Sequence, residues 1–230
     1  MHGHAADRML GEAVEHSFLA ALPEDALERL TVGAVRLDVP AGSTLYREGE
    51  RPSMALLADG LLRVYLTSAH GRQVTIRYAR AGSVLGVPLA IAGPVDTSVQ
   101  ALTRVTLFVL NVATVQALGQ TDARVAWALA QEVTRRLYEV LDAFTGNAFG
   151  SVRQRVARHL LDLAAEHQHD AALVAPVSQQ ELADAAGTVR EVVTRVLREM
   201  RDEGLVETSK QGVILSDPAS LQRVADLRNE

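Results

Sequence analysis

The sequence predicts an α+β fold in which an N-terminal antiparallel β-roll, a long central helix and a C-terminal helix-turn-helix with a β-hairpin wing follow one another. Three observations predict this order. Short β-like runs separated by glycines fill residues 32–111, one apolar stripe of helical period covers 122–147, and two short amphipathic helices precede a hairpin pattern in 178–215. We expect three parts, residues 1–120, 121–147 and 148–230.

The composition excludes several classes of protein. Hydrophobic residues make up 48% and charged residues 22% of the chain, which is an ordinary globular mixture. We find neither a signal-peptide pattern nor an apolar run long enough to span a bilayer, so we expect a cytoplasmic protein without membrane contact. The sequence contains no cysteine, which excludes disulfides, thiolate catalysis and cysteine-ligated metal clusters. No nucleophile elbow or phosphate-binding loop is present, so we expect no enzyme.

The N-terminal part opens with two helical patterns. Apolar residues recur at helical spacing from Met9 to Leu22, and Pro23 with Glu24 and Asp25 has the composition of a helix start. The texture then changes to short runs with β propensity, namely VRLDVPAGSTLYREGE, MALLADGLLRVYLT, GRQVTIRYARAG and TSVQALTRVTLFVLN. Glycines recur about every eleven residues and are interpreted as turn corners of an antiparallel roll; they are Gly49, Gly60, Gly71 and Gly82.

The central helix is longer than a typical globular helix. Its apolar stripe consists of Val125, Leu129, Val133, Leu137, Val140, Leu141 and Phe144. Such a stripe can pack on the roll of its own chain or against the same helix of a second copy. We place the hinge to the last part of the chain between residues 146 and 150.

Two helices joined by a tight turn are predicted next. In VSQQELADAAG, Ser178 has the position of an N-cap and Glu181 that of its capping-box partner, and Gly187 permits a sharp turn. In GTVREVVTRVLREMRDEGLV, Thr188 and Glu191 have the spacing of a second capping box. The apolar stripe of the second helix is Val189, Val193, Val196, Leu197 and Met200, and Gly204 follows as its C-terminal cap.

Polar residues at the start of this second helix project away from the stripe. Arginine presents a planar fork to O6 and N7 of guanine, glutamate accepts from N4 of cytosine, and threonine reaches a phosphate or a base. The pattern is that of a helix-turn-helix, whose second helix enters the DNA major groove, and GLVETSKQGVILSD predicts its β-hairpin wing. Because the net charge is −5, attraction to DNA must come from a local patch. The candidate DNA-binding residues are Arg190, Glu191, Thr194, Arg195, Ser178, Gln179 and Thr188.

The order of elements and two stretches resemble the CRP/FNR family of bacterial transcription regulators over roughly residues 17–217. QELADAAGTVREVVTRVLREMRDEGLV is similar to the family pattern GxSRETVxRxLxxLxxxGLI, and PAGSTLYREGE with LLADGLLRVY is similar to the entry into the family's cyclic-nucleotide-binding-like β-roll. The resemblance places Arg190, Glu191 and Arg195 at base-reading positions for a TGTGA-like palindrome. Val189 and Val192 stand where the family has serine and threonine. The loss of these hydroxyls should weaken the positioning of the protein on the DNA backbone more than its choice of bases.

The resemblance also implies partners. It implies a homodimer joined through the long central helix, double-stranded DNA as target, and RNA polymerase as a contact of the segment from His167 to Ala175. A two-fold protein matches a palindromic operator, with the recognition helices one DNA turn, roughly 34 Å, apart. The candidate dimer-interface residues are Val125, Leu129, Val133, Leu137, Val140 and Phe144.

The effector pocket departs from the pattern of the family's cAMP binders. Their cassette supplies a glutamate for the ribose and an arginine for the cyclic phosphate, whereas VLGVPLAIAGPVDTSVQA keeps Gly86 but has Val87 and Pro88 in the glutamate region and Val95 followed by Asp96 in the arginine region. A buried phosphate without a cation is costly, and a nearby carboxylate repels it. We therefore expect cAMP binding to be absent or very weak. The pocket candidates are Gly86, Val87, Pro88, Leu89, Val95, Asp96, Thr97, Val140 and Leu141.

Alternatives remain for the sensor and for the overall function. An apolar cavity suits an unknown small hydrophobic effector or haem, with His16 or His70 as an axial ligand, or is filled by side chains. No bound cofactor is the first expectation. His167 and His169 lack the partners of a zinc site, so no metal is expected there. From a different class, the chain could be a ligand-binding or scaffold module whose helix-turn-helix contacts protein rather than DNA.

Overall fold

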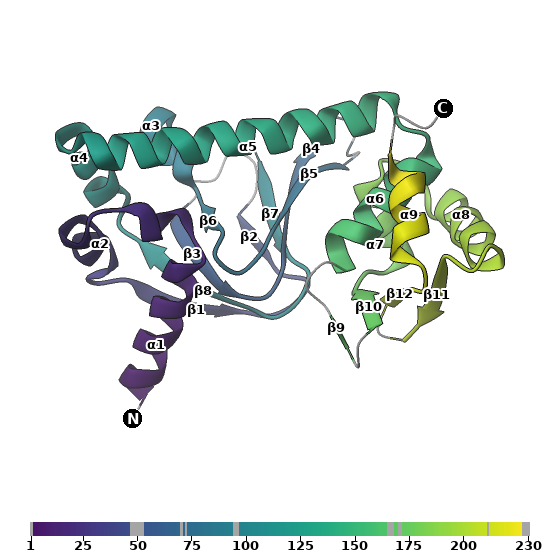
Figure 1. Cartoon of the computed structure of the whole chain (residues 1–230), viewed down its shortest axis with the longest axis horizontal. Helices are drawn as coiled ribbons and strands as arrows, with labels where there is room; N and C mark the ends of the chain where they lie inside the picture. Colours follow the sequence, from purple (N-terminus) through teal and green to yellow (C-terminus); the bar gives the residue numbers. More distant parts are fainter. Residues whose placement is uncertain are drawn as a thin grey trace. The chain divides into compact units, whose positions relative to one another are not determined.

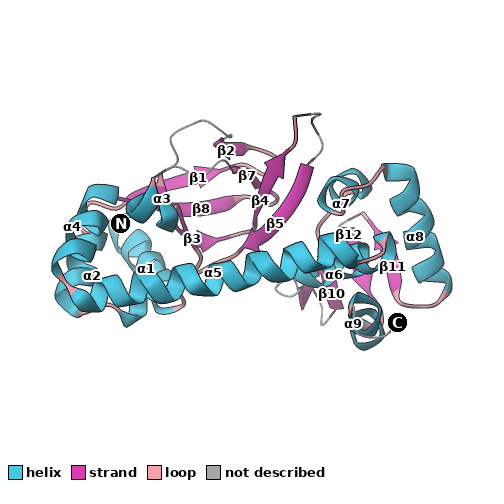
Figure 2. Ribbon diagram, turned by 90° about the horizontal axis from the view of Figure 1, so that it is seen from above, coloured by secondary structure: helices cyan, strands magenta, loops and turns pink. Residues whose placement is uncertain are grey.

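The computed structural model describes most of the chain, namely residues 2–46, 53–69, 71, 73–93, 97–164, 168–169, 172–210 and 212–226. The chain divides into two compact units. The N-terminal unit comprises Met1–Val64 and Ala79–Glu139, and the C-terminal unit comprises Tyr65–Tyr78 and Val140–Glu230. The order of elements is helices, β-roll, long helix and a second group of helices with a small sheet, as the sequence predicts (Figures 1 and 2).

Three short helices open the N-terminal unit, namely α1 (His2–Glu15), η1 (Phe18–Ala21) and α2 (Glu24–Thr31). The hydroxyl of Ser17 caps η1, because it accepts from the backbone N–H of Leu19 at 3.1 Å. Pro23 is the N-cap of α2, with Glu24 and Asp25 in its first turn. This confirms the predicted helix start, where carboxylates suit the positive end of the helix dipole.

The β-roll consists of two antiparallel four-stranded sheets, with strand orders β1-β8-β3-β6 and β2-β7-β4-β5. The strands are β1 (Val35–Val39), β2 (Thr44–Tyr46), β3 (Met54–Asp59), β4 (Leu62–Thr67), β5 (Gln73–Ala79), β6 (Val84–Leu85), β7 (Ser98–Ala101) and β8 (Val105–Leu110). Val35 pairs with Val109 and Val39 with Val105, so β1 and β8 run antiparallel. The predicted antiparallel roll is therefore confirmed.

The recurring glycines occupy turns, as predicted. Gly60, Gly71 and Gly82 have φ values of 92°, 78° and 82°, which lie in the left-handed region that favours glycine. Gly49 lies outside the described residues. Gly82 is fixed by space as well, since a Cβ there would come within 2.3 Å of the carbonyl oxygen of His16. The turn between β5 and β6 thus packs directly on the backbone that links α1 to η1.

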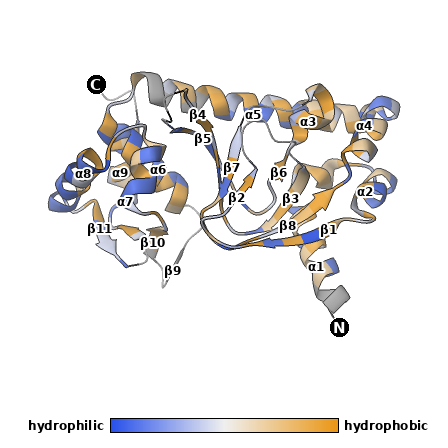
Figure 3. Cartoon of the chain, turned by 180° about the vertical axis from the view of Figure 1, so that it is seen from behind, coloured by the Kyte–Doolittle hydropathy of each residue, from blue (hydrophilic) through white to orange (hydrophobic). Residues whose placement is uncertain are grey.

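Two apolar clusters form the core of this unit. Within the roll, the buried residues are Ala55, Leu57, Leu62, Val64, Ala79, Leu85, Val99, Ala101, Val105 and Leu107. The second cluster joins the outer face of the roll to the helices and contains, among others, Leu19, Leu30, Met54, Leu56, Phe108, Leu118, Val125 and Leu129. Figure 3 shows β3 and β8 mostly in the colour of apolar residues, because each strand contributes side chains to both clusters.

Three helices complete the unit, namely α3 (Val87–Ala92), α4 (Val112–Thr121) and α5 (Ala123–Phe149), whose last part lies in the C-terminal unit. Asp122 separates α4 from α5, and its carboxylate accepts from the backbone and the guanidinium of Arg124, which lowers the pKa of Asp122 to about 2. The sequence predicts that the long helix begins at Asp122, one residue before its observed start at Ala123. In the part of the chain that the structure describes, no helix has the length and apolar composition of a membrane span.

The apolar stripe of α5 is partly buried in the core of its own chain and partly exposed. Val125 and Leu129 are only 1% and 6% exposed and belong to the core of their own chain, so the prediction that they meet a partner is wrong. Val133 packs partly on the same core. The remaining predicted residues, Leu137, Val140 and Phe144, are exposed. Further exposed apolar residues of α5 are Trp127, Tyr138, Leu141 and Phe149, and of these only Leu141 belongs to the predicted stripe.

The C-terminal unit contains four helices and a small antiparallel sheet in its described residues. They are α6 (Val152–Ala164), β9 (Gln168–His169), β10 (Ala172–Ala175), α7 (Gln179–Ala185), α8 (Arg190–Asp202), β11 (Val206–Ser209), β12 (Gly212–Leu215) and α9 (Pro218–Ala225). The sheet has the order β11-β12-β10-β9. Val206 pairs with Leu215 and Ser209 with Gly212, which confirms the predicted hairpin wing. Helix α5 continues through Gly146 to Phe149, so the break before α6 lies at the end of the predicted hinge.

Candidate nucleic-acid interface and effector pocket

A complete capping box starts α7. The hydroxyl of Ser178 accepts from the backbone N–H of Glu181 at 3.2 Å, and a carboxylate oxygen of Glu181 accepts from the backbone N–H of Ser178 at 2.8 Å. This confirms the prediction and satisfies two backbone donors that would otherwise lack partners. Gly187, with φ 61°, makes the left-handed turn that leads to α8.

The start of α8 differs from the predicted one. Its N-cap is Val189, which makes no side-chain capping bond, so the predicted capping box of Thr188 and Glu191 is wrong. Thr188 still belongs to the turn, because its backbone N–H donates to the carbonyl of Ala183. Val189 has extended backbone and is 57% exposed, so it does not belong to the apolar stripe as predicted.

The rest of the stripe of α8 is buried as predicted. Its buried residues are Val193, Val196, Leu197 and Met200. The helix ends in a Schellman motif, in which the N–H of Leu205 donates to the carbonyl of Met200 and that of Gly204 donates to the carbonyl of Arg201, each at 2.9 Å. Gly204 has φ 75° and follows the cap residue Glu203. The C-terminal end of the buried face is thereby fixed in the unit.

The opposite face of α8 is polar and exposed. Figure 3 shows part of the ribbon of α8 in the colour of hydrophilic residues. Arg190, Glu191, Thr194 and Arg195 are all exposed. Among the described residues the guanidinium of Arg190 has no hydrogen-bond or ion-pair partner, and Nε of Arg195 lies 4.0 Å from a carboxylate oxygen of Glu199, beyond hydrogen-bonding distance. Forked donors that the protein leaves unsatisfied are available to an external acceptor such as guanine.

Two further arginines extend this face and were missed by the sequence reasoning. Arg198 and Arg201 are exposed, and within the described residues neither guanidinium has a partner. Their spacing was the available signal, because Arg198 and Arg201 stand at i+8 and i+11 from Arg190 and so fall on the same face of the helix. Guanidinium groups along one helix face suit the phosphates that flank a reading site.

One side-chain contact connects the two helices of the motif. Oγ1 of Thr194 lies 2.8 Å from Oε1 of Gln179 and 2.9 Å from the carbonyl oxygen of Arg190. The hydroxyl has a single proton, so it donates to one of these oxygens at a time unless the amide of Gln179 is turned to donate from its nitrogen. In either arrangement the side chains of Thr194 and Gln179 orient each other.

Two arginines of α6 bind the turn between α7 and α8 and the end of α8. Arg155 donates from Nε to the carbonyl of Ala186 at 2.9 Å and from Nη1 to the carbonyl of Gly150 at 2.7 Å. Arg153 forms two bonds with the carboxylate of Glu203 at the end of α8, at 2.9 and 2.5 Å. The Arg153 guanidinium lowers the pKa of Glu203 below its ordinary value. The turn between α7 and α8 and the end of α8 are thus both anchored to α6.

The cassette region forms a left-handed turn followed by a short helix with apolar side chains. Gly86, at φ 74°, is the N-cap of α3, and a Cβ there would lie 2.8 Å from the carbonyl oxygen of Ser53. Val87 is fully buried in the core of the unit, and Pro88 at the second position of α3 has no N–H. The N–H of Leu89 is already used, because it donates to the carbonyl of Gly86 at 3.0 Å.

The structure describes only some of the remaining pocket candidates. Val95 and Asp96 lie outside the described residues, and Thr97, which follows them, is half-buried. Val140 and Leu141 on α5 are 40% and 49% exposed. Their role in the effector pocket stays a prediction.

A buried ion pair beside the cassette was not anticipated. Arg136 of α5 pairs with Glu132 one turn earlier and donates from Nη2 to the carbonyl of Val84 at 2.5 Å, two residues before Gly86. Both side chains are almost fully buried. The i, i+4 spacing of a glutamate and an arginine was the sequence signal. This arginine is already neutralised by Glu132 and bonded to the chain, so it is a poor candidate for binding an anionic ligand.

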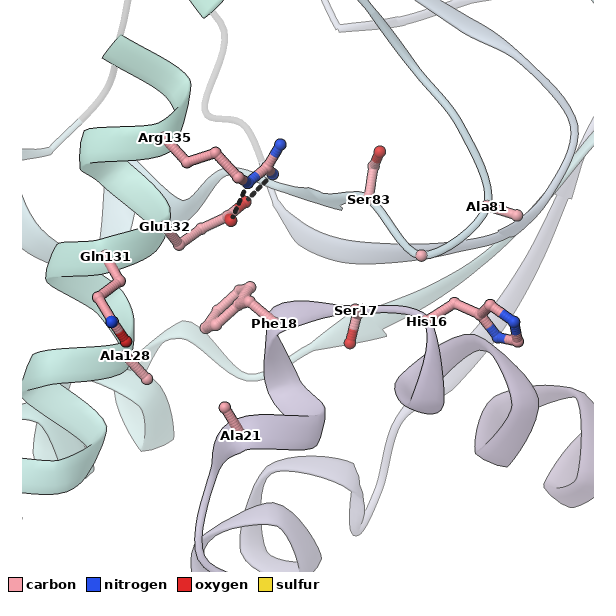
Figure 4. A pocket seen from close by; sticks show the side chains of 11 residues that line it. His16, Ser17, Phe18, Ala21, Ala81, Ser83, Ala128, Gln131, Glu132 and Arg135 are labelled. Atoms are coloured by element: carbon pink, nitrogen blue, oxygen red, sulfur yellow. Dashed lines mark hydrogen bonds and ion pairs between the residues drawn. The ribbon is translucent and has the colours of Figure 1, made fainter. Parts of the chain in front are cut away.

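A polar pocket of about 400 Å³ lies on the other side of Glu132 (Figure 4). Phe18 and Ser17 face it from η1 and the residue before it, Ser83 from the turn before β6, and Glu132 and Arg135 from α5. Arg135 donates to both carboxylate oxygens of Glu132, at 3.0 and 2.9 Å. Glu132 is thus shared by Arg135 and Arg136, and Arg135 also pairs with Glu139, so two glutamates balance two arginines beside the pocket.

The histidines do not form a metal site in the part of the chain that is described. No group of three histidine, cysteine or carboxylate side chains has the spacing for a metal there. Nδ1 of His16 lies 2.8 Å from the carbonyl oxygen of Glu12, the preceding turn of α1, and the imidazole is exposed. His70 and His167 lie outside the described residues, and His169 is in β9.

An antiparallel roll with a ligand-cassette turn, a long helix and a winged helix-turn-helix with free arginines define a DNA-binding transcriptional regulator with a sensor-type domain. Comparison with known families agrees in both parts. Residues 36–122 match the "Cyclic nucleotide-binding domain" and residues 154–224 match the "Crp-like helix-turn-helix domain". The chain belongs to the CRP/FNR family of transcriptional regulators.

Relatives and solved structures are similar over most of the chain. The transcriptional regulator LdrP of Thermus thermophilus is 31% identical over 188 residues, which cover 79% of this chain and 92% of that protein. The "Cyclic AMP receptor protein" from another strain of the same species is 29% identical over 188 residues, covering 81% and 86%. A crystal structure of a CRP-family transcriptional regulator, also from Thermus thermophilus, has 28% identity and a TM-score of 0.68, covering 82% of this chain and 96% of that chain.

Proposed function

We propose that this regulator binds a palindromic, TGTGA-like operator as a homodimer, independently of cAMP. The observation that carries the proposal is the exposed start of α8, where the guanidinium of Arg190 is free within the described residues and that of Arg195 is at most loosely held. Arg190 and Arg195 each recognise a guanine, and Glu191 accepts from a cytosine. Thr194, Ser178, Gln179 and Thr188 contact the backbone or orient the readers.

The proposed dimer interface is the exposed apolar face of α5. Members of this family bind DNA as dimers. In this chain Leu137, Val140 and Phe144 expose large apolar side chains along the helix, and such a continuous face is typical of a protein contact. We propose that 1–120 forms the sensor part, 121–147 the dimerisation helix and 148–230 the DNA-binding part.

Independence from cAMP is supported by the chemistry of the cassette. A cyclic phosphate carries a full negative charge, which must be met by a cation or several N–H donors when it is buried. Val87 is in the core, Pro88 lacks an N–H and the N–H of Leu89 is occupied. The name of the cAMP receptor among the relatives describes that protein, and the residues of this cassette differ from those a cAMP site requires. The effector, where one is used, is a different molecule.

Members of the family also contact RNA polymerase. We propose the segment from His167 to Ala175 for this contact, part of which lies outside the described residues. A rival function, a scaffold whose helix-turn-helix binds protein, leaves the free arginines without a purpose. Its expected DNA affinity is weak and independent of base sequence.

The experiment compares a duplex carrying two inverted TGTGA half-sites one helical turn apart with a duplex of the same composition in scrambled order. Fluorescence anisotropy follows binding over a range of salt concentrations, with and without cAMP. We expect tight binding to the palindrome, a steep fall of affinity with salt, and no response to cAMP. Equal affinity for both duplexes would reject the base-reading assignment, and binding only with cAMP would reject independence from the nucleotide.

A further inference from the structure

The pocket of about 400 Å³ between η1, the turn before β6 and α5 is separate from the cassette, because none of the residues from Gly86 to Leu89 lines it (Figure 4). Its volume lies in the range of sites for small molecules. Three of its lining residues have the smallest side chain with a Cβ, namely Ala21, Ala81 and Ala128. The structure therefore leaves space for a small molecule beside the N-terminal half of α5.

The walls of this pocket are held by contacts within the protein. A Cβ on Gly82 would come within 2.3 Å of the carbonyl oxygen of His16, and the N–H of Gly82 donates to the carbonyl of Leu57 at 2.8 Å. The hydroxyl of Ser17 donates to the carbonyl of Val14 at 2.8 Å. Because these walls are already ordered, a molecule that enters the pocket has little ordering entropy to offset.

The charges beside the pocket are balanced by the protein itself. Glu132 is bonded by both Arg135 and Arg136, and Arg135 also pairs with Glu139. Of these four residues, Glu132 and Arg135 line the pocket. An anion in the pocket would lie near the carboxylate and a cation near the guanidinium, so each would meet a like charge. This balance favours a molecule without net charge.

Hydrogen-bonding groups on the lining side chains remain available. Within the described residues, the amide of Gln131 has no hydrogen-bond partner. Oγ of Ser83 accepts from the backbone N–H of Arg80 at 3.0 Å, and its own proton has no acceptor there. Nδ1 of His16 lies 2.8 Å from the carbonyl oxygen of Glu12 and so carries the proton, which leaves Nε2 of the neutral ring as an acceptor. The pocket therefore offers donors and acceptors together.

An aromatic ring supplies an apolar surface next to these polar groups. Phe18 is half-buried, and its ring lies between η1 and α5, on the side of Gln131 (Figure 4). Planar aromatic molecules stack on such a ring. A flat ring with donors and acceptors on its edge matches this combination of surfaces, as in a nucleobase or an aromatic carboxamide.

We propose that this pocket binds an uncharged planar heteroaromatic molecule of the nucleobase or aromatic carboxamide class. The ring of the molecule stacks on Phe18, and its polar edge exchanges hydrogen bonds with Gln131 on α5 and Ser83 on the turn before β6. The site goes beyond the proposed function, because binding there requires neither DNA nor a dimer.

Saturation-transfer NMR on the full chain without DNA tests the chemistry of the site. The probes are adenine and nicotinamide, which are uncharged at neutral pH, and nicotinate, which has the ring of nicotinamide with a carboxylate in place of the amide. We expect at least one neutral probe to bind at millimolar concentration and nicotinate to bind more weakly than it. Binding of neither neutral probe, or binding of nicotinate as tight as that of the neutral probe, overturns the assignment.

Three substitutions test the place of binding. Ala81→Phe fills the pocket from an exposed position and should abolish binding. Phe18→Leu removes the stacking ring and should weaken binding about tenfold, and Gln131→Ala removes a hydrogen-bond partner and should weaken it about three- to tenfold. Gln116→Ala is the matched control, because Gln116 is an exposed glutamine of α4 that does not line the pocket.

Thermal unfolding followed by circular dichroism checks that each variant is folded. Because Ala81 and Gln131 are exposed, we expect both of their variants to keep the stability of the parent chain. Binding that survives Ala81→Phe, or that falls as much in Gln116→Ala as in Gln131→Ala, overturns the placement in this pocket.

Discussion

Thr194 and Gln179 touch across the two helices of the DNA-binding motif, with Oγ1 of Thr194 2.8 Å from Oε1 of Gln179. The contact joins the first residue of α7 to the second turn of α8, where Oγ1 of Thr194 also lies 2.9 Å from the backbone carbonyl oxygen of Arg190. It is a direct side-chain link between the two helices. A network of this kind is tested by removing each partner and then both.

Gln179→Ala and Thr194→Val should each reduce affinity for the operator about three- to tenfold, because a neutral hydrogen bond contributes about 0.5–1.5 kcal/mol. The double variant should lose little more than either single one. Fully additive losses would show that the two side chains act separately on DNA. Binding isotherms on the palindrome and the scrambled duplex provide the measurement.

Arg190→Ala should cost about 1–3 kcal/mol of specific binding and relax the preference at one base position of each half-site. Arg198→Ala should weaken binding to all duplexes alike and reduce the salt dependence by about one phosphate contact. Arg29→Ala, an exposed change on α2, is the control and should do neither. A uniform loss for Arg190→Ala, with base preference retained, would assign it to the phosphates instead.

Ser178→Ala should lower the free energy of unfolding by about 1 kcal/mol, because it removes the acceptor for the backbone N–H of Glu181 at the start of α7. Urea denaturation followed by circular dichroism measures this loss. Thr188→Ala should have no comparable effect, since α8 has no side-chain cap. Equal losses in the two variants would contradict the assignment of the caps.

The ion pair of Arg153 and Glu203 should make a small, pH-dependent contribution to stability. The folded-state pKa of Glu203 is lowered, so the stabilisation is present above the unfolded pKa of glutamate, about 4.3, and is lost as the pH falls through the lower folded value. Because both side chains are partly exposed, we expect about 0.2–1 kcal/mol at neutral pH. Arg153→Met should remove this amount at pH 7 and none below the folded pKa. A difference that grows towards acid pH would have the wrong sign.

The order of elements and the exposed polar face of α8 were predictable because they depend on local signals. Residues close together in the sequence determine the helical period, the glycine turns and the capping box of Ser178 and Glu181. Two helices were missed although each has a local start signal: Asn111 caps α4, and Asp217 followed by Pro218 begins α9. The helices α4 and α9 have only 10 and 8 residues, so each offers few turns in which a helical period can be recognised.

Other features depend on tertiary packing and could not be derived from spacing. The stripe of α5 is apolar over its whole length, but only packing against the roll decides that Val125 is buried and Leu137 is exposed. The same holds for Val189, whose exposure follows from the turn geometry that starts α8 one residue later than the stripe suggested. The i, i+4 spacing of Glu132 and Arg136 is a signal that they pair, but only the packing around them decides that the pair is buried.

Selection of bound duplexes from a random pool, without cAMP, tests the central claim most directly. The account predicts enrichment of a two-fold symmetric sequence whose half-sites are about one helical turn apart and contain guanines that Arg190→Ala no longer selects. Recovery of no common sequence, or of one that Arg190→Ala selects equally well, would contradict it.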